Sequence, residues 1–346
     1  LVGSNSQTVT IINNPFSATI SDKNGQKMVI NPDDSAIFES NLPETQYPDL
    51  YQASEFDYKT DVAKNGPTSV AMTFDFVTPD VRLSGLASHS LPLNLPTTTP
   101  DSDPIRLFNT YPYPYENNSP AAMQGSVPFI FAHSKSGCDG LIWSNPSETW
   151  IDISDQENKG KRVRFISEGG FIEFFAFSSN SHSSLTSIYT TLTGRPLFVP
   201  EFALGFHQGR WGYYSDIEVE SVSKQLDDHL IPHETMWLSI DSLANKREFF
   251  TFSEDSLPNP EKLFDNFAKC ERYIIVPVGP SLQAMNENYA VYKEAKEKDL
   301  LIKTKGNNIY YANSYPGKCA WPDFLNPKTA SWWESLFSYQ SQFYRF

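Results

Sequence analysis

The sequence predicts a multi-domain fold in which an antiparallel β-sandwich precedes a segment of alternating strands and helices. The chain has 346 residues, about two domains at the usual ~150 residues each. Its texture changes near residue 180, where short β-branched and aromatic runs give way to longer stretches with helical periodicity. These two observations place an all-β domain at residues 1–181 and a different class of domain after it.

The first domain consists of short apolar runs separated by Gly, Pro, Asn and Asp. Such runs with turn residues between them, and with little helical periodicity, are typical of an antiparallel sandwich. The expected strands are residues 8–12, 69–77, 126–133, 140–144, 148–153, 161–167 and 171–177.

A connecting helix is predicted in the linker at residues 182–199, because "SSLTSIYTTLTGRP" has helical spacing and ends at Gly194 and Pro196. Over residues 200–346 strands and helices alternate, which indicates parallel βαβ units. The expected strands are 202–208, 235–241, 272–279 and 300–305, and the expected helices are 215–230, 259–270, 288–299 and 326–340.

Both an open doubly wound sheet and a closed barrel fit this alternation. The turn after the first strand, "GFHQGRWGYYS", has bulky residues where a dinucleotide fold needs a glycine-rich phosphate loop, so a barrel is favoured. A (β/α)8 barrel needs ~250 residues, and this segment offers about three principal strands. We therefore expect the natural protein to continue past Phe346, and the fragment alone to expose a barrel edge.

Composition excludes several functions. The formal net charge is −14 and no run of Lys or Arg occurs, so we expect neither a nucleic acid partner nor an anionic lipid surface. No apolar stretch reaches the ~20 residues of a membrane span. The three cysteines are widely spaced and the six histidines are scattered, so we expect no metal and no cofactor.

Several ordered blocks resemble glycoside hydrolase family 31. They are "LTGRPLFVPEFALGFHQGRWGYYS", "HETMWLSID", "KREFFTF", "YPGKCAWPDFLNP" and "SWWESLFSY", with "IRLFNTYPYPY" in the sandwich half. The resemblance implies a retaining α-glucosidase made of a β-sandwich and a (β/α)8 TIM barrel. Retention requires two carboxyl groups about 5–5.5 Å apart, a nucleophile and an acid/base. The family carries these two carboxyl groups in two sequence blocks, and neither block is found in this chain. No catalytic residue is therefore expected among its 346 residues. By resemblance both would lie beyond Phe346, because the chain stops before barrel strand 4.

The resemblance also implies a changed sugar pocket. Ser239 stands where the family usually carries an Asp that binds glucose hydroxyls, and Tyr111 stands where a sandwich loop usually supplies another Asp. Gly279 replaces a further Asp after the next strand. We expect Trp237, on the strand of Ser239, to pack in the barrel rather than stack on sugar.

Other candidate substrate-binding residues keep the family pattern. Asp241, after Ile240, is expected either to touch sugar or to cap the next turn. Arg210 would line the cleft, although an Arg–carboxylate brace is the favoured interpretation. Tyr315 would offer an aromatic platform, and Asp323 would either face the cleft or fix its loop.

Two function classes follow from the resemblance. The first is a hydrolase of terminal α-linked glucose, acting in carbohydrate metabolism or N-glycan trimming, with weak or absent hydrolysis. The second is a catalytically degenerate scaffold that binds glycans or a protein partner. The resemblance also implies an α-glucoside or N-glycan ligand, a regulatory lectin-bearing partner subunit, and the endoplasmic reticulum lumen or another secretory compartment.

Overall fold

The computed structural model forms two compact units, residues 1–196 and 197–346. It describes residues 7–23, 25–39, 55–56, 59–60, 69–110, 114–157, 160–245 and 247–337. Each unit has its own hydrophobic core. Within the described residues no helix is long and apolar enough to span a bilayer.

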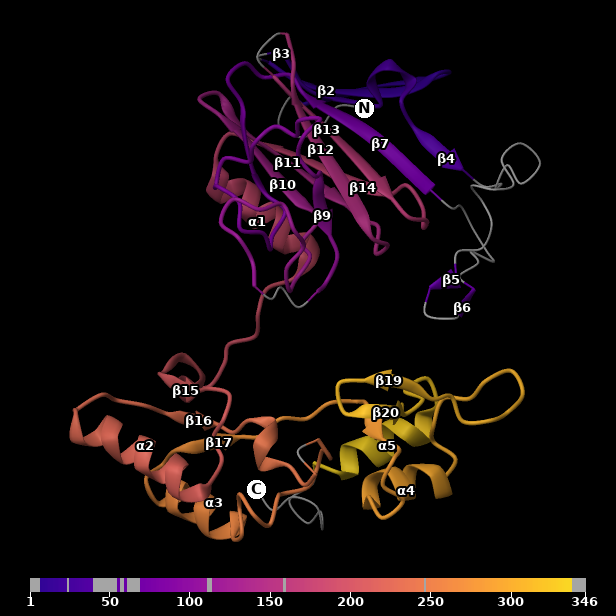
Figure 1. Ribbon diagram of the computed structural model, residues 1–346. Helices are drawn as coiled ribbons and strands as arrows, with labels where there is room; N and C mark the ends of the chain where they lie inside the picture. Colours follow the sequence, from indigo (N-terminus) through magenta and orange to yellow (C-terminus); the bar gives the residue numbers. More distant parts are fainter. Residues whose placement is uncertain are drawn as a thin grey trace. The chain divides into compact units, whose positions relative to one another are not determined.

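The first unit is a sandwich of two antiparallel sheets (Figure 1). Its larger sheet has the order β1-β2-β3-β7-β13-β12-β9, and β4 also pairs with β7. These strands are β1 (Thr8–Asn13), β2 (Phe16–Asp22), β3 (Gly25–Ile30), β4 (Ile37–Glu39), β7 (Ser69–Phe76), β9 (Ile105–Leu107), β12 (Thr149–Asp155) and β13 (Lys161–Ser167). A separate two-stranded hairpin joins β5 (Glu55–Phe56) to β6 (Lys59–Thr60).

The second sheet has the order β14-β11-β10-β8. Its strands are β8 (Arg82–Gly85), β10 (Phe129–Ser134), β11 (Gly137–Trp143) and β14 (Phe174–Ser179). Alternating side chains of both sheets fill the space between them. Trp143 stacks on Phe165 with ring centroids 5.4 Å apart. Its indole N–H donates a 2.8 Å hydrogen bond to the Ser167 hydroxyl, so this buried polar group is satisfied.

Helix α1 (His182–Thr193) packs on the outer face of the second sheet (Figure 1). The helix begins after an N-cap serine, because the Ser181 side chain accepts a hydrogen bond from the Ser184 N–H. The ring of Tyr189 stacks on Phe129 at 4.2 Å, and Leu185 is fully buried. The helix thus belongs to the compact sandwich unit.

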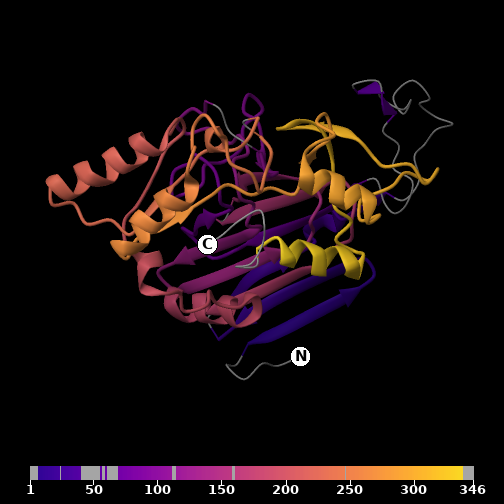
Figure 2. The same cartoon turned by 90° about the horizontal axis from the view of Figure 1, so that it is seen from below.

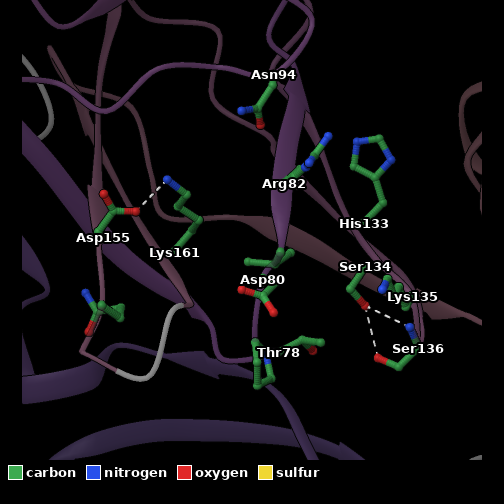
Figure 3. A pocket seen from close by; sticks show the side chains of 13 residues that line it. Thr78, Asp80, Arg82, Asn94, His133, Ser134, Lys135, Ser136, Asp155 and Lys161 are labelled. Carbon is green, nitrogen blue, oxygen red and sulfur yellow. Dashed lines mark hydrogen bonds and ion pairs between the residues drawn. The ribbon is translucent and has the colours of Figure 1, made fainter.

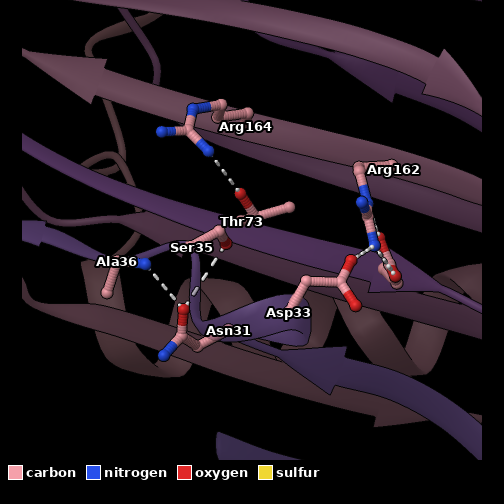
Figure 4. Close-up of polar contacts among 8 residues, drawn as sticks. Asn31, Asp33, Ser35, Ala36, Thr73, Arg162 and Arg164 are labelled. Atoms are coloured by element: carbon pink, nitrogen blue, oxygen red, sulfur yellow. Dashed lines mark hydrogen bonds and ion pairs between the residues drawn. The ribbon is translucent and has the colours of Figure 1, made fainter. Parts of the chain in front are cut away.

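An arginine ties the larger sheet to the 3-10 turn at Pro32–Asp34 (Figure 4). The Arg162 guanidinium on β13 makes two hydrogen bonds to Asp75 on β7, at 2.6 and 2.7 Å, and one to Asp33 at 2.9 Å. Because the fork geometry is bidentate, it fixes the β7–β13 register as well as adding Coulomb energy.

The second unit begins with a short 3-10 turn (Glu201–Leu204) and a parallel sheet of order β15-β16-β17. These strands are β15 (His207–Gly209), β16 (Thr235–Trp237) and β17 (Tyr273–Ile275), with the helices α2 (Asp216–Asp228) and α3 (Pro260–Lys269) between them. Helix α3 packs against β17 and α2 packs against α3, and both views show the two helices side by side (Figure 2). Met236, Val219, Leu263 and Phe267 bury their side chains in the resulting core. The predicted parallel βαβ arrangement and its three principal strands are present.

The rest of the unit differs from the predicted pattern. It contains an antiparallel sheet of order β18-β20-β19, made of β18 (Leu282–Gln283), β19 (Ala312–Ser314) and β20 (Gly317–Ala320), with the helices α4 (Ala290–Glu297) and α5 (Pro327–Ser335). The strand predicted at 300–305 is wrong, since this segment makes only isolated bridges, Leu301 to Pro322 and Lys303 to Ile309. A turn at Thr304–Asn308 folds it back before a ladder can extend.

Candidate functional site

The candidate site lies at the carboxyl ends of β15 and β16, the edge where parallel β/α folds carry their functional side chains. A hollow of about 390 Å³ opens there. It is lined by His207, Gly209, Arg210, Trp237 and Leu238. The parallel register aligns Gly209 with Trp237, and a Cβ on Gly209 would lie 2.9 Å from the Cβ of Trp237. A glycine is therefore needed beside this large side chain.

Ser239 and Asp241 follow the end of β16 and bind each other. The Ser239 hydroxyl donates to Asp241 Oδ2 at 2.9 Å, and the Asp241 backbone N–H returns a 3.3 Å bond to Ser239 Oγ. Ser239 thereby caps a 3-10 turn at Ile240–Ser242. The predicted strand to residue 241 is too long, because β16 ends at Trp237 and this cap takes over the backbone.

Burial limits what this pair can reach. Asp241 is only 9% exposed, and half-buried Ile240 packs against the core of the α4 and α5 region. The capping role that the sequence allowed for Asp241 is thus present in the geometry. The Ser239 hydroxyl proton is therefore donated to the Asp241 carboxylate and not to a group outside this pair.

Trp237 is held by a short hydrogen-bond relay that the sequence did not suggest. Its indole N–H donates to His207 Nδ1 at 3.0 Å, and His207 Nε2 lies 3.0 Å from the Phe202 carbonyl oxygen. With these partners Nδ1 accepts from the indole and Nε2 donates to the carbonyl oxygen. The indole is 45% exposed, so the expected packing of Trp237 inside the barrel is not seen in this chain.

Arg210 forms an ion pair with Glu218 at the start of α2. Its guanidinium also lies 4.6 Å from the ring centroid of Tyr213, and it donates to the Trp211 carbonyl oxygen at 3.2 Å. These contacts brace the β15–α2 connection. The guanidinium therefore lies at the rim of the hollow with its charge paired to the Glu218 carboxylate.

Tyr315 and Asp323 belong to the antiparallel part of the unit. Tyr315 lies in the turn between β19 and β20 and is half exposed, with the Arg247 guanidinium 5.1 Å from its ring. Arg247 also donates to the Tyr315 carbonyl oxygen at 2.7 Å. Asp323 accepts a 3.1 Å bond from the Leu325 N–H, a contact that fixes its own loop.

The remaining candidate, Tyr111, lies outside the described residues. Within the described part of the chain, no three His, Cys, Asp or Glu side chains come close enough together to hold a metal ion. The hollow at the ends of β15 and β16 thus presents the exposed Trp237 indole, with the engaged Asp241 carboxylate following β16, while the exposed Tyr315 phenol belongs to the antiparallel part of the unit. Such a set can bind a sugar by stacking and hydrogen bonding, but its described groups do not form the two-carboxylate machinery of retention.

Comparison with known proteins identifies both units. Residues 1–152 match the model of the glycosyl hydrolase 31 N-terminal galactose mutarotase-like domain, and residues 196–345 match the glycosyl hydrolases family 31 TIM-barrel domain. Glucosidase 2 subunit alpha of Schizosaccharomyces pombe is 32% identical over 310 residues, which are 87% of this chain and 33% of that protein. Neutral alpha-glucosidase AB of Mus musculus is 32% identical over 305 residues, 83% of this chain and 32% of its own length.

Solved structures agree with these matches. The heterodimeric complex of ER glucosidase II, a catalytic subunit with the binding domain of its regulatory subunit, superposes with a TM-score of 0.89 at 29% identity. A glucosidase II alpha subunit described as alpha3-Glc2-bound gives the same score and identity. Each comparison covers 99% of this chain and 39% of the other. The chain therefore spans about a third of the length of the curated relatives that it matches.

Proposed function

The chain belongs to glycoside hydrolase family 31, among its glucosidase II-like α-glucosidases, and from this premise we propose a terminal α-glucose pocket in which hydrolysis is weak or absent. The observation that carries the proposal is the Ser239–Asp241 pair at the end of β16. The family resemblance puts a glucose-binding Asp at position 239. Here that position offers a neutral hydroxyl that is already donated to Asp241.

The energetic consequence is large enough to matter for rate. A hydrogen bond to a charged group contributes about 1.5–3 kcal/mol. Whatever part of that interaction strengthens only in the transition state enters kcat directly. Losing such a contact at Ser239 and, by resemblance, a second at Tyr111 would lower transition-state stabilisation without disturbing the scaffold.

The proposal extends to ligand, partner and compartment. We propose an α-glucoside or N-glycan as ligand, because the relatives are α-glucosidases and one was solved with alpha3-Glc2. A glucosidase II β-subunit-like partner is proposed because a relative was solved with the binding domain of its regulatory subunit. The endoplasmic reticulum lumen, or another secretory compartment, follows as the proposed location.

Substrate contacts are proposed for seven residues. Ser239, Ile240, Asp241 and Arg210 lie at or near the ends of β15 and β16, Tyr315 and Asp323 lie in the antiparallel part, and Tyr111 completes the set by resemblance. In this proposal no residue of the chain acts as nucleophile or general acid/base.

A catalytically degenerate scaffold that binds glycans or a protein partner is the second candidate function. The relay from Phe202 through His207 to Trp237 favours it, since it holds a half-exposed indole in a fixed orientation. An aromatic face of this kind binds a sugar ring without any catalytic carboxylate.

The deciding experiment uses the natural gene product that carries these residues. Glucose release from an α-1,3-linked glucose disaccharide should be at least ~1000-fold below the typical kcat of about 10 per second. The double variant S239D/Y111D should raise kcat, whereas S331D, at an exposed position of α5, should not. Turnover near 10 per second in the unmodified protein would refute the proposal of weak hydrolysis. If the double variant shows no gain in kcat and binds the disaccharide as the unmodified protein does, the scaffold function is favoured instead.

A further inference from the structure

A wide cleft opens in the sandwich unit among three of its connections (Figure 3). Its volume is about 1220 Å³. The walls come from the β7–β8, β10–β11 and β12–β13 connections, together with Asn94. None of the described lining residues is Phe, Tyr or Trp, although aromatic platforms are what neutral sugars usually require. Apart from Pro79 and Val81, the lining residues carry polar or charged side chains.

The carboxylates of the cleft are already engaged. Asp155 accepts a 2.6 Å bond from Lys161 Nζ, and Asp80 also has an interaction partner. The side chains of Arg82 and Lys135, by contrast, make no ion pair and no hydrogen bond with the described residues. In a protein whose formal net charge is −14, the described part of this cleft therefore holds two cationic side chains that form no ion pair with another described residue.

Arg82 stands beside a histidine in the same opening. The antiparallel register aligns Arg82 on β8 with His133 on β10, and Figure 3 shows the Arg82 side chain between Asn94 and His133. His133 Nε2 lies 3.3 Å from Ser84 Oγ, and the His182 ring centroid is 6.0 Å from that of His133. Burial, and then the nearby His182 and Arg82, lower the pKa of His133. The positive charge of Arg82 thus acts on this opening and would attract an anion there.

We propose that this cleft binds an oxyanion, a phosphate or carboxylate group, and that Arg82 is its principal contact. The planar guanidinium can donate two parallel hydrogen bonds to such a group. Lys135 adds a point charge, and the amide of Asn94 and the imidazole of His133 add neutral donors. A sugar phosphate and a free phosphate ion share this chemistry.

The test is calorimetric titration of the whole chain with inorganic phosphate, glucose 6-phosphate, glucuronate and glucose at constant ionic strength. The oxyanion probes should bind saturably and depend on Arg82, whereas any glucose that binds at the β15–β16 hollow should bind the Arg82→Ala variant as it binds the parent. Arg82→Ala should weaken binding roughly tenfold or more, because a charged, bidentate contact is lost. Arg82→Lys should recover part of it, and Arg195→Ala, at another exposed arginine of the unit, should change nothing.

The outcomes separate the sources of the anion. Tighter binding of glucose 6-phosphate than of inorganic phosphate would assign the site to a phosphorylated sugar, and equal binding would assign it to free phosphate. Independently of any variant, phosphate should raise the pKa of His133, measured from its imidazole proton resonances. The proposal is overturned if no oxyanion binds saturably, or if Arg82→Ala and Arg195→Ala bind alike.

Discussion

Ser239 and Asp241 are joined by two hydrogen bonds. The serine hydroxyl donates to the Asp241 carboxylate at 2.9 Å and accepts from the Asp241 backbone N–H at 3.3 Å. This pair of bonds gives Ser239, which lies just past the end of β16, a structural role as the cap of the next turn. Four predictions follow from this contact and from three others in the two units, and each concerns the stability or reactivity of the chain itself.

Removing the Ser239 hydroxyl should destabilise the second unit. Ser239→Ala leaves the Asp241 N–H without its cap, a change that costs about 0.5–2 kcal/mol in measured N-caps. Ser239→Asn keeps an acceptor at the same place and should cost less. Urea unfolding of both variants checks the order, and equal stability of Ser239→Ala and the parent would show that the cap contributes nothing.

Asp139 should make the sandwich less stable as pH rises from about 4. Burial raises the pKa of this carboxyl above its ordinary value, although the Ser178 hydroxyl and Lys27 act in the opposite direction. Because the folded pKa is the higher one, the unfolded chain ionises first, and stability falls as pH rises from the unfolded pKa through the folded one.

The variant Asp139→Asn tests this dependence. It retains an acceptor for the 2.6 Å bond from Ser178 Oγ and removes the buried charge. Its stability relative to the parent should therefore increase between pH 4 and pH 7. Asp101→Asn, at an exposed position, controls for the change in net charge. An opposite trend would mean that Lys27 outweighs burial.

A side chain at Gly279 should clash with Phe249. A Cβ built there lies 2.7 Å from two atoms of the Phe249 ring. Gly279→Ala should cost about 1–3 kcal/mol, the usual range for overpacking. Gly306→Ala is a matched control, because its Cβ meets Asn308 at an ordinary 3.5 Å. If both alanine variants unfold at the same urea concentration, the ring moves freely and the clash is absent.

The three thiols should differ sharply in reactivity. Cys270 is exposed, whereas Cys138 and Cys319 are buried. Burial, and then the neighbouring Asp139 charge, raise the pKa of Cys138 to about 11, and burial raises the pKa of Cys319. A disulfide reagent at pH 8 should therefore titrate one thiol in the native chain and three in denaturant, since only thiolates react. Rapid reaction of a Cys270→Ser variant would contradict this.

The sequence predicts the elements that have strong local signals. Helices α1, α2 and α3 begin where Ser181, Ser215 and Asn259 provide capping oxygens, and such caps are readable from residue type and spacing. The long sandwich strands also follow from their alternating or wholly apolar runs.

Other features depend on contacts that no local pattern encodes. The strands of the antiparallel β18-β20-β19 sheet have two to four residues, too few to show a period. The apolar residues Leu238 and Ile240 continue the alternation of β16, and only the side-chain cap at Ser239 ends it. The His207–Trp237 bond joins residues 30 positions apart on neighbouring strands, so it depends on the β15–β16 register that only the folded sheet sets.

The sandwich core has a consequence for how the protein is made. Its buried members run from Ala18 to Phe165, with Ala176 packed against them, and all belong to residues 1–196. Once this length has left the ribosome, every partner in that core is available, while the second unit is still being synthesised. Folding of the nascent chain can therefore proceed in two successive steps. A core substitution in the sandwich would act during the first of them, before the residues at the ends of β15 and β16 are synthesised.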